Sequence, residues 1–186
     1  MIPEPCVATI GFFDGVHMGH RYLIQQVKEI AAAKGLRSAL VTFPVHPRKV
    51  MNAAYHPELL TTPEEKTNLL AGTGVDYCLM LDFTPDISRL TAKEFMTQIL
   101  KERYQVKYLV IGYDHRFGHN RSEGFDDYVR YGQAIGIEVI RAQAYTDDIQ
   151  IDTTQSAPVS SSLIRKLLHQ GDVDVAARCL GYEYFL

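Results

Sequence analysis

Two histidines stand three positions apart in a glycine-containing segment near the start of the chain, which reads GFFDGVHMGH over residues 11–20. A helical pattern of apolar residues follows directly, so the segment should lie at a helix N-terminus. Such an end presents backbone N–H groups and the positive end of the helix dipole, and both favour phosphate. The imidazole N–H groups of His17 and His20 can stabilise charge developing on a phosphate oxygen. The candidate binding residues of this segment are Gly11, Phe12, Phe13, Asp14, Gly15 and Gly19.

Two other interpretations of the histidines stay open from the residues alone. The pair could only satisfy backbone groups in a capping turn, or it could form half of a metal site with His115 and His119. The sequence contains neither a P-loop pattern nor Gly-x-Gly-x-x-Gly, which disfavours P-loop and ordinary dinucleotide chemistry. We prefer the phosphate interpretation and assign no residue to a metal.

Three consecutive serines form a second candidate phosphate site. Ser160, Ser161 and Ser162 precede an apolar helical pattern, and Arg165 follows about one turn later. Hydroxyl and guanidinium groups at a helix start can hold phosphate oxygens, although serines there are often only helix caps. Taken with the segment of residues 11–20, the serines and Arg165 favour a site in which two helix N-termini converge on one polyphosphate.

Two further loops carry residues suited to an aromatic ligand. In the loop of residues 112–121, the candidate binding residues are Asp114, Arg116, Phe117 and Gly118. In the loop of residues 43–48, Phe43 and His46 could flank a planar ring, and Pro47 would stiffen this wall of the binding site. A solvated turn in the first case and a rigid connection packed on the core in the second are the alternatives.

Hydrophobic patterning predicts the scaffold that holds these loops. Short apolar runs alternate with helical segments, as in βαβ units. We predict strands at residues 7–10, 39–43, 77–81, 108–111 and 137–140. Right-handed crossovers would give an α/β fold, a doubly wound parallel sheet of about five strands that binds ligands beyond their carboxyl ends. The loops after the first, second and fourth strands are those described above.

Helix signals fill the intervals between the strands. Thr62 and Thr91 each begin a capping-box pattern, so a helix should start after each of them. We also predict helices at about residues 125–134 and, in two parts broken at 170–171, at residues 160–180. Residues 145–158 are polar without a clear period, and we expect a mobile or edge segment there.

Composition narrows the class of protein. The chain has 186 residues, 46% of them hydrophobic, which suits one domain over residues 1–186. A net charge of −3 without a basic run disfavours a nucleic-acid partner. Three widely spaced cysteines fit a reducing compartment better than a disulfide framework. With no stretch of about 20 apolar residues, we expect a cytoplasmic protein without a membrane partner.

The chain resembles the adenylyltransferase module of bacterial bifunctional FAD synthetase, the riboflavin kinase/FMN adenylyltransferase family. The family signature Gly-x-Phe-Asp-Gly-Val-His-x-Gly-His is matched at residues 11–20, and its Ser-Ser-Thr-x-Ile-Arg element at residues 160–165. The similarity extends over nearly the whole chain. Among the departures, Ser162 replaces the usual threonine and His115 a usual phenylalanine.

The resemblance implies a Rossmann-like fold of the nucleotidyltransferase type and roles for the matching residues. His17 and His20 would stabilise the triphosphate of ATP during transfer, and Ser161, Ser162 and Arg165 would bind it. The residues expected to line the nucleotide pocket are Gly11, Phe12, Asp14 and Gly15. Those expected near the flavin or the reacting phosphates are Phe43, His46, Pro47 and Asp114.

The implied reaction transfers AMP from ATP to FMN, with Mg²⁺ accompanying the ATP and FAD as the product. The family also has a riboflavin kinase module, which we expect to be missing from this chain. Three alternatives stay open: another phosphorylated acceptor, a flavin- or nucleotide-binding module without catalysis, and a zinc-dependent hydrolase.

Overall fold

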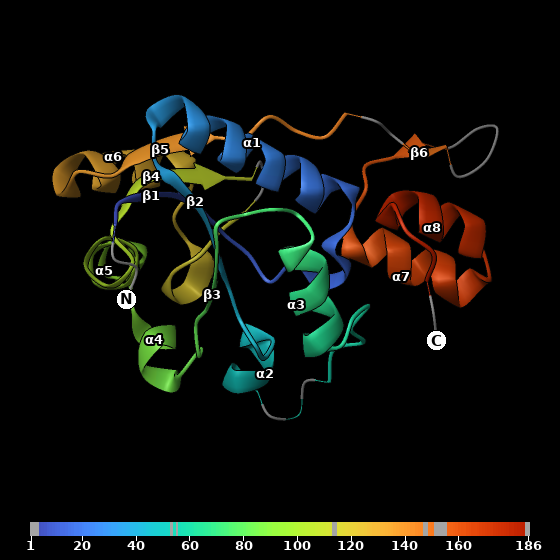
Figure 1. The fold of residues 1–186 in the computed structure, drawn as a ribbon. Coiled ribbons are helices and arrows are strands. Elements are labelled where there is room, and N and C mark those ends of the chain that lie inside the picture. The colour runs from blue at the N-terminus through green and yellow to red at the C-terminus, as the bar shows by residue number, and fades with distance from the viewer. Residues whose placement is uncertain are drawn as a thin grey trace.

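The computed structural model describes residues 4–52, 54, 56–112, 115–146, 149–150 and 156–184. Figure 1 shows a layered α/β arrangement with a parallel sheet at its centre. In chain order the elements are β1 (Cys6–Ile10), η1 (Asp14–Val16), α1 (Met18–Lys34), β2 (Arg37–Thr42), α2 (Pro47–Met51), α3 (Pro63–Ala71), β3 (Tyr77–Met80), α4 (Pro85–Arg89), α5 (Ala92–Glu94), η2 (Phe95–Arg103), β4 (Val106–Ile111), η3 (His119–Arg121), α6 (Phe125–Ile135), β5 (Glu138–Arg141), β6 (Ile149–Gln150), β7 (Ser156–Ala157), α7 (Ser161–Gln170) and α8 (Val173–Leu180).

The main sheet has the order β3-β2-β1-β4-β5, and each neighbouring pair is parallel. All five predicted strands are present, and the predicted α/β class is confirmed. The chain moves outward from β1 to β3 and then returns to place β4 on the other side of β1. This reversal leaves a crevice beyond the carboxyl ends of β1 and β4, where doubly wound sheets bind ligands.

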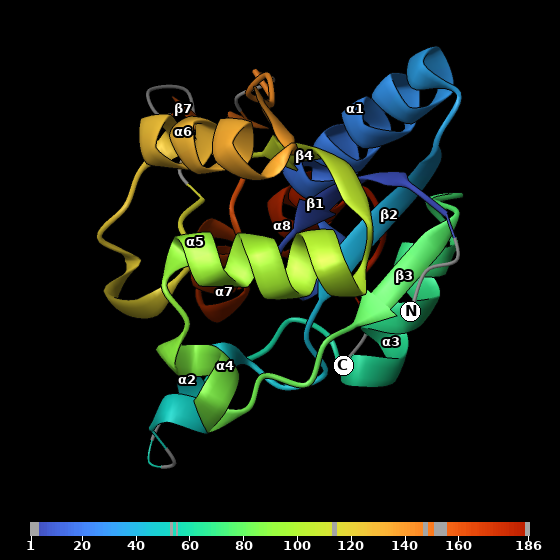
Figure 2. The ribbon, with the colours of Figure 1, turned by 90° about the vertical axis from the view of Figure 1, so that its left-hand side faces the viewer.

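Helices cover both faces of the sheet, because successive side chains of each strand point to opposite faces. On β1, Ala8 and Ile10 pack in the cluster that includes Phe95 and Met96 of η2, which lies on the same face as α6. Val7 instead packs in the cluster that contains residues of α1. In Figure 2 the continuous helix formed by α5 and η2 crosses the sheet beside α6.

Local capping explains where the helices begin and end. Thr62 accepts a hydrogen bond from the backbone N–H of Glu65, whose carboxylate accepts one from the Thr62 N–H, and Thr91 makes the same capping box with Glu94. Both predicted helix starts are therefore confirmed. The predicted break in the C-terminal helical region is also confirmed, since Gly171 ends α7 in the left-handed region at a φ of 82°.

Several elements differ from the expectation. The short helices α2 and α4 were not predicted, since five residues are too few for a helical pattern to be recognised. The helix that starts after Thr91 continues as a π-helix over η2. Within residues 145–158, where we expected a mobile or edge segment, the described part contains the antiparallel pair β6–β7. Every described helix is too short or too polar to cross a membrane.

The helices α7 and α8 form a small unit of their own. They lie together at the opposite end of the molecule from α6 (Figure 1). Ile164, Leu167 and Leu180 are buried in a separate cluster that also receives Leu60 from the segment between α2 and α3. This packing holds the N-terminus of α7 in a fixed position next to the loop after β1.

Candidate active site

A first cavity, of about 720 Å³, lies beyond the carboxyl ends of β1, β4 and β5, and its walls include Ile10, Gly112 and Ala142. Both segments that carry phosphate-binding patterns contribute to it. The predicted site residues that line it are Gly11, Phe12, Phe13, Asp14, His17, Gly19, His20, His46, Ser160, Ser161, Ser162 and Arg165. Gly15 is not part of its lining.

His17 is the N-cap of α1, and its ring is stacked on that of His20 with the ring centroids 3.6 Å apart. The backbone N–H of His20 donates to Nδ1 of His17 over 3.3 Å. Because Nδ1 accepts this bond, the proton of the neutral ring belongs on Nε2. Burial lowers the pKa of His17 to about 4, so the ring serves as a neutral N–H donor at pH 7.

His20 lies in the first turn of α1, and aromatic contacts hold its ring. Its ring meets that of Phe13 edge to face, 5.2 Å between centroids. Burial, and then the neighbouring His17 and His115, lower the pKa of His20 well below its ordinary value. Its buried Nδ1 has no hydrogen-bond partner among the residues that the structure describes. An unsatisfied buried polar atom in a cavity wall is consistent with a ligand that completes it.

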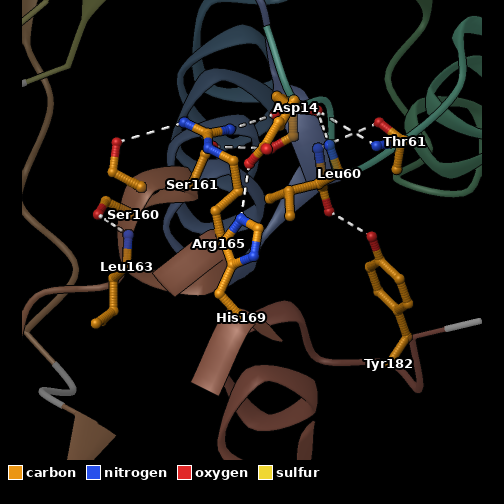
Figure 3. Close-up of polar contacts among 12 residues, drawn as sticks. Asp14, Leu60, Thr61, Ser160, Ser161, Leu163, Arg165, His169 and Tyr182 are labelled. Atoms are coloured by element: carbon orange, nitrogen blue, oxygen red, sulfur yellow. Dashed lines mark hydrogen bonds and ion pairs between the residues drawn. The ribbon is translucent and has the colours of Figure 1, made fainter. Parts of the chain in front are cut away.

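Asp14 joins three parts of the chain around this cavity (Figure 3). One carboxylate oxygen accepts the backbone N–H groups of Leu60 and Thr61 at 2.9 and 3.3 Å, and the other accepts the guanidinium of Arg165 at 2.8 Å. Burial is the largest influence on its pKa and raises it, while these donors act in the opposite direction. The backbone oxygen of Asp14 also accepts the Ser161 hydroxyl at 3.0 Å. Asp14 therefore orients Arg165 and attaches α7 to the β1–α1 loop.

The three serines have distinct partners. Ser160 caps α7 by accepting the backbone N–H of Leu163, Ser161 donates to the Asp14 backbone, and the Ser162 hydroxyl accepts Arg165 at 3.4 Å. The capping alternative thus holds for Ser160. A Cβ atom added to Gly19 would lie 3.7 Å from the Val159 carbonyl oxygen. The starts of α1 and α7 are therefore neighbours at one cavity, as the sequence predicts.

A second cavity, of about 490 Å³, adjoins the first. Aromatic rings from five separate parts of the chain form its apolar walls, and these are Phe12, Phe43, Phe83, Phe95 and Phe117. The side chains of Arg48, Arg116 and Arg121 add positive charge. The predicted residues Phe43, His46, Pro47, Arg116, Phe117 and Gly118 all line this cavity. Asp114 lies outside the described residues.

Four residues line both cavities, namely Ile10, Phe12, His46 and His115. Phe12 and His46 meet edge to face with their ring centroids 4.7 Å apart. His46 also caps α2 by accepting the backbone N–H of Arg48. The loops after β1 and β2 therefore build a common wall at which ligands in the two cavities would meet.

Sequence reasoning missed several residues of the site. Tyr182 donates to the Gly15 backbone oxygen at 2.7 Å, and Thr61 accepts the Gly15 N–H at 3.3 Å. Lys66 is buried behind Phe12 and Phe43, with 2% of its surface exposed. No local pattern marks them, because each acts through a contact distant in sequence. Within the part of the chain that the structure describes, no group of three or more His, Cys, Asp or Glu side chains could hold a metal ion.

Comparison with known proteins agrees with this geometry. The family model described as FAD synthetase matches residues 1–157. The chain belongs to the FAD synthetase family. It is 34% identical over 179 residues to a bifunctional riboflavin kinase/FMN adenylyltransferase of Listeria monocytogenes, covering 96% of this chain and 54% of that protein. It is 32% identical over 181 residues to the protein of the same name from Escherichia coli, covering 97% and 56%.

The chain thus spans about half the length of the curated relatives that it matches. A crystal structure described as a macrolide-efflux protein from Streptococcus pneumoniae superimposes with a TM-score of 0.82 at 28% identity, over 99% of this chain and 67% of that one. The fold of this FAD synthetase domain therefore recurs in a solved protein.

Proposed function

We propose that this chain transfers AMP from ATP to FMN, giving FAD and pyrophosphate. The observation that carries the proposal is the pair of adjoining cavities, which share a wall. The first is bordered by two helix N-termini with their polar side chains, and the second is walled by aromatic rings. The two chemistries match the two parts of the reaction. A nucleoside triphosphate needs N–H donors and positive dipole ends, whereas an isoalloxazine ring needs apolar and aromatic walls.

The triphosphate of ATP would lie in the first cavity, between the starts of α1 and α7. Backbone N–H groups at these helix starts, the guanidinium of Arg165 and the hydroxyl group of Ser162 supply its donors. The hydroxyl proton of Ser161 is donated to the Asp14 backbone oxygen, so Ser161 holds the start of α7 in place. Gly19 leaves room there, since a Cβ atom at this position would approach the His17 ring to 3.2 Å. The nucleotide would then present its α-phosphorus toward the shared wall.

FMN would place its ring in the second cavity and its phosphate at the shared wall. An oxygen of that phosphate attacks the α-phosphorus, the bond from the α-phosphorus to the oxygen bridging to the β-phosphorus breaks, and pyrophosphate leaves. The attacking oxygen is already anionic, so the protein need not supply a nucleophile. Its contribution is to position both substrates and to donate hydrogen bonds from His17 and His20 as charge develops.

Magnesium would enter with ATP. The carboxylate of Asp14 is already occupied by Leu60, Thr61 and Arg165. The donor groups of the first cavity therefore suit an ion that is held chiefly by phosphate oxygens and water, the usual condition of Mg²⁺. The bound ion would neutralise part of the triphosphate charge.

We further propose that the chain acts alongside a riboflavin kinase module, because the relatives carry both activities in their names and are about twice as long. A reducing, cytoplasmic compartment is part of this proposal, since Cys6, Cys78 and Cys179 are all present as thiols.

A product analysis tests the function. The protein is incubated with ATP and Mg²⁺ together with FMN, riboflavin, phosphopantetheine or nicotinamide mononucleotide, and the products are separated. FAD and pyrophosphate in equal amounts, formed only with FMN, are expected. A dinucleotide formed only with another acceptor would reject FMN as the substrate. Binding of FMN and ATP without release of pyrophosphate would favour a non-catalytic module instead.

A further inference from the structure

Lys66 lies beneath the wall that the two cavities share. It comes from α3, is 2% exposed, and is not among the residues that line either cavity. Its ammonium donates to the Phe43 carbonyl oxygen at 2.7 Å and lies 3.8 Å from the centroid of the Phe12 ring. A single buried cation therefore contacts the loop after β1 and the loop after β2.

Burying the Lys66 ammonium costs desolvation free energy, and filling space in the core would not require a charged group. Burial lowers the pKa of Lys66 to about 8, while the charge of Asp14 opposes that shift. The neighbouring Cys78 thiol has a raised pKa and stays neutral at pH 7. An apolar side chain of similar length would avoid the desolvation of an ammonium. The ammonium, however, orients an aromatic face and a carbonyl oxygen at the same time, which a methyl group cannot do.

We propose that Lys66 is a positioning residue for the transfer reaction: its ammonium holds the Phe12 ring and the Phe43 backbone, and thereby sets how the two substrates meet. This inference rests on the proposed function. The ring of Phe12 separates the two cavities and contacts His46, so a shift of this ring changes the alignment of one substrate with the other. Each cavity retains its own remaining walls, so each substrate alone would still bind.

Lys66→Met tests the inference because it keeps an unbranched side chain, one atom shorter than that of lysine, and removes the charge. We expect kcat to fall about tenfold or more, since small errors of alignment are costly, while the dissociation constants for FMN and for an α,β-methylene analogue of ATP change by less than about threefold. Lys66→Gln should behave alike, although its amide can still donate to the Phe43 carbonyl. Lys28→Met is the matched control, because Lys28 also donates to a backbone oxygen, that of Thr73 at 2.7 Å, away from both cavities.

A double-mutant cycle separates positioning from a general structural role. If Lys66 acts through Phe12, adding Lys66→Met to Phe12→Leu should lower kcat by less than about twofold beyond Phe12→Leu alone. If the two substitutions instead lower kcat by independent factors that multiply in the double variant, the inference is overturned. A kcat of Lys66→Met within about threefold of that of the unaltered chain would also overturn it, as would a failure of both Lys66 variants to fold. Absence of FAD formation by the unaltered chain would reject the proposed function itself, and the inference with it.

Discussion

The two cavities differ in the chemistry of the side chains that line them. Polar groups bonded to one another form one side of the first cavity, and the carboxylate and backbone oxygens of Asp14 alone accept four hydrogen bonds. Aromatic rings line the second, and they come from the segments before η1, before α2, before α4, within η2 and before η3. Polar recognition requires each donor to be fixed, so its residues are linked through short contacts. Apolar recognition requires only the correct volume and shape, which distant segments can supply together.

This contrast has a consequence for substitutions. A change in the first cavity should affect turnover and binding of the nucleotide, whereas a change in the second should affect the acceptor alone. Substitutions in each cavity, and at the helix that begins at the first, should reveal that separation.

Loss of a buried imidazole donor should have the largest effect. His20→Ala should lower kcat by about 10² or more, as expected for the loss of one preorganised donor at a developing oxyanion. His17→Asn should act similarly, while the asparagine side chain can still cap α1. Steady-state kinetics with ATP and FMN measure both. The exposed His56, which lines neither cavity, supplies the control His56→Ala, and near-normal turnover of both site variants would reject the donor role.

His17 also makes the stability of the fold sensitive to acid. In the unfolded chain His17 takes up a proton near pH 6.5, whereas in the folded chain its pKa is about 4. Stability is therefore complete above pH 6.5 and is lost as the pH falls toward 4. Between pH 7 and pH 5 the free energy of unfolding should drop by about 2 kcal/mol from this residue alone.

Urea denaturation at the two pH values measures this loss. His17→Asn lacks the titrating ring, so its own decrease in stability should be smaller than that of the unaltered chain by about 2 kcal/mol. Equal decreases in both proteins would show that His17 is not buried as a neutral ring.

A substitution in the second cavity should change the KM for FMN without changing the KM for ATP. Phe43→Leu removes one aromatic wall, whose ring meets that of Phe83 edge to face at 5.5 Å between centroids. We expect the KM for FMN to rise about tenfold, corresponding to about 1.4 kcal/mol, with the KM for ATP nearly unchanged. Phe125→Leu, on α6 and outside both cavities, is the control. An equal rise of both KM values would contradict the division between the cavities.

The smallest expected effects are those of removing two helix caps, one at the first cavity and one away from it. Ser160→Ala and Thr91→Ala each remove a side-chain acceptor at a helix N-cap and should each lower the free energy of unfolding by about 1 kcal/mol. Only Ser160→Ala should also raise the KM for ATP, because only α7 begins at the first cavity. Thermal denaturation and initial rates measure the two quantities. A raised KM for ATP in Thr91→Ala would show that the effect comes from stability rather than position.

The fold was largely predictable, because its signals are local. Strands buried on both faces appear as continuous apolar runs, and the threonine caps of α3 and α5 lie three residues from their glutamate partners. The short helix α2 escaped prediction because a histidine cap and five residues leave no periodic pattern. The η2 helix could be predicted as helical, but no local pattern in the sequence distinguishes its π-helical hydrogen bonds from α-helical ones.

The site was predictable to the extent that its residues are contiguous. His17, His20 and the serines lie in short segments whose chemistry can be inferred directly. The role of the Asp14 carboxylate could not be inferred, because its partners Leu60 and Arg165 lie 46 and 151 positions away. Lys66 follows two glutamates on α3 and resembles an ordinary surface lysine in sequence. Only the packing of α3 against the sheet buries it.

The contacts of Tyr182 with Gly15 and of Arg165 with Asp14 bear on how this domain can be divided. Residues 1–157, the portion matched by the family model, include the whole sheet and the histidine segment. A protein shortened to that portion would keep the scaffold and the first of the two candidate phosphate-binding segments. Asp14, however, would lose its ion pair with Arg165, and Gly15 its hydrogen bond from Tyr182. The two C-terminal helices are therefore a component of the proposed catalytic centre rather than an appendage to it.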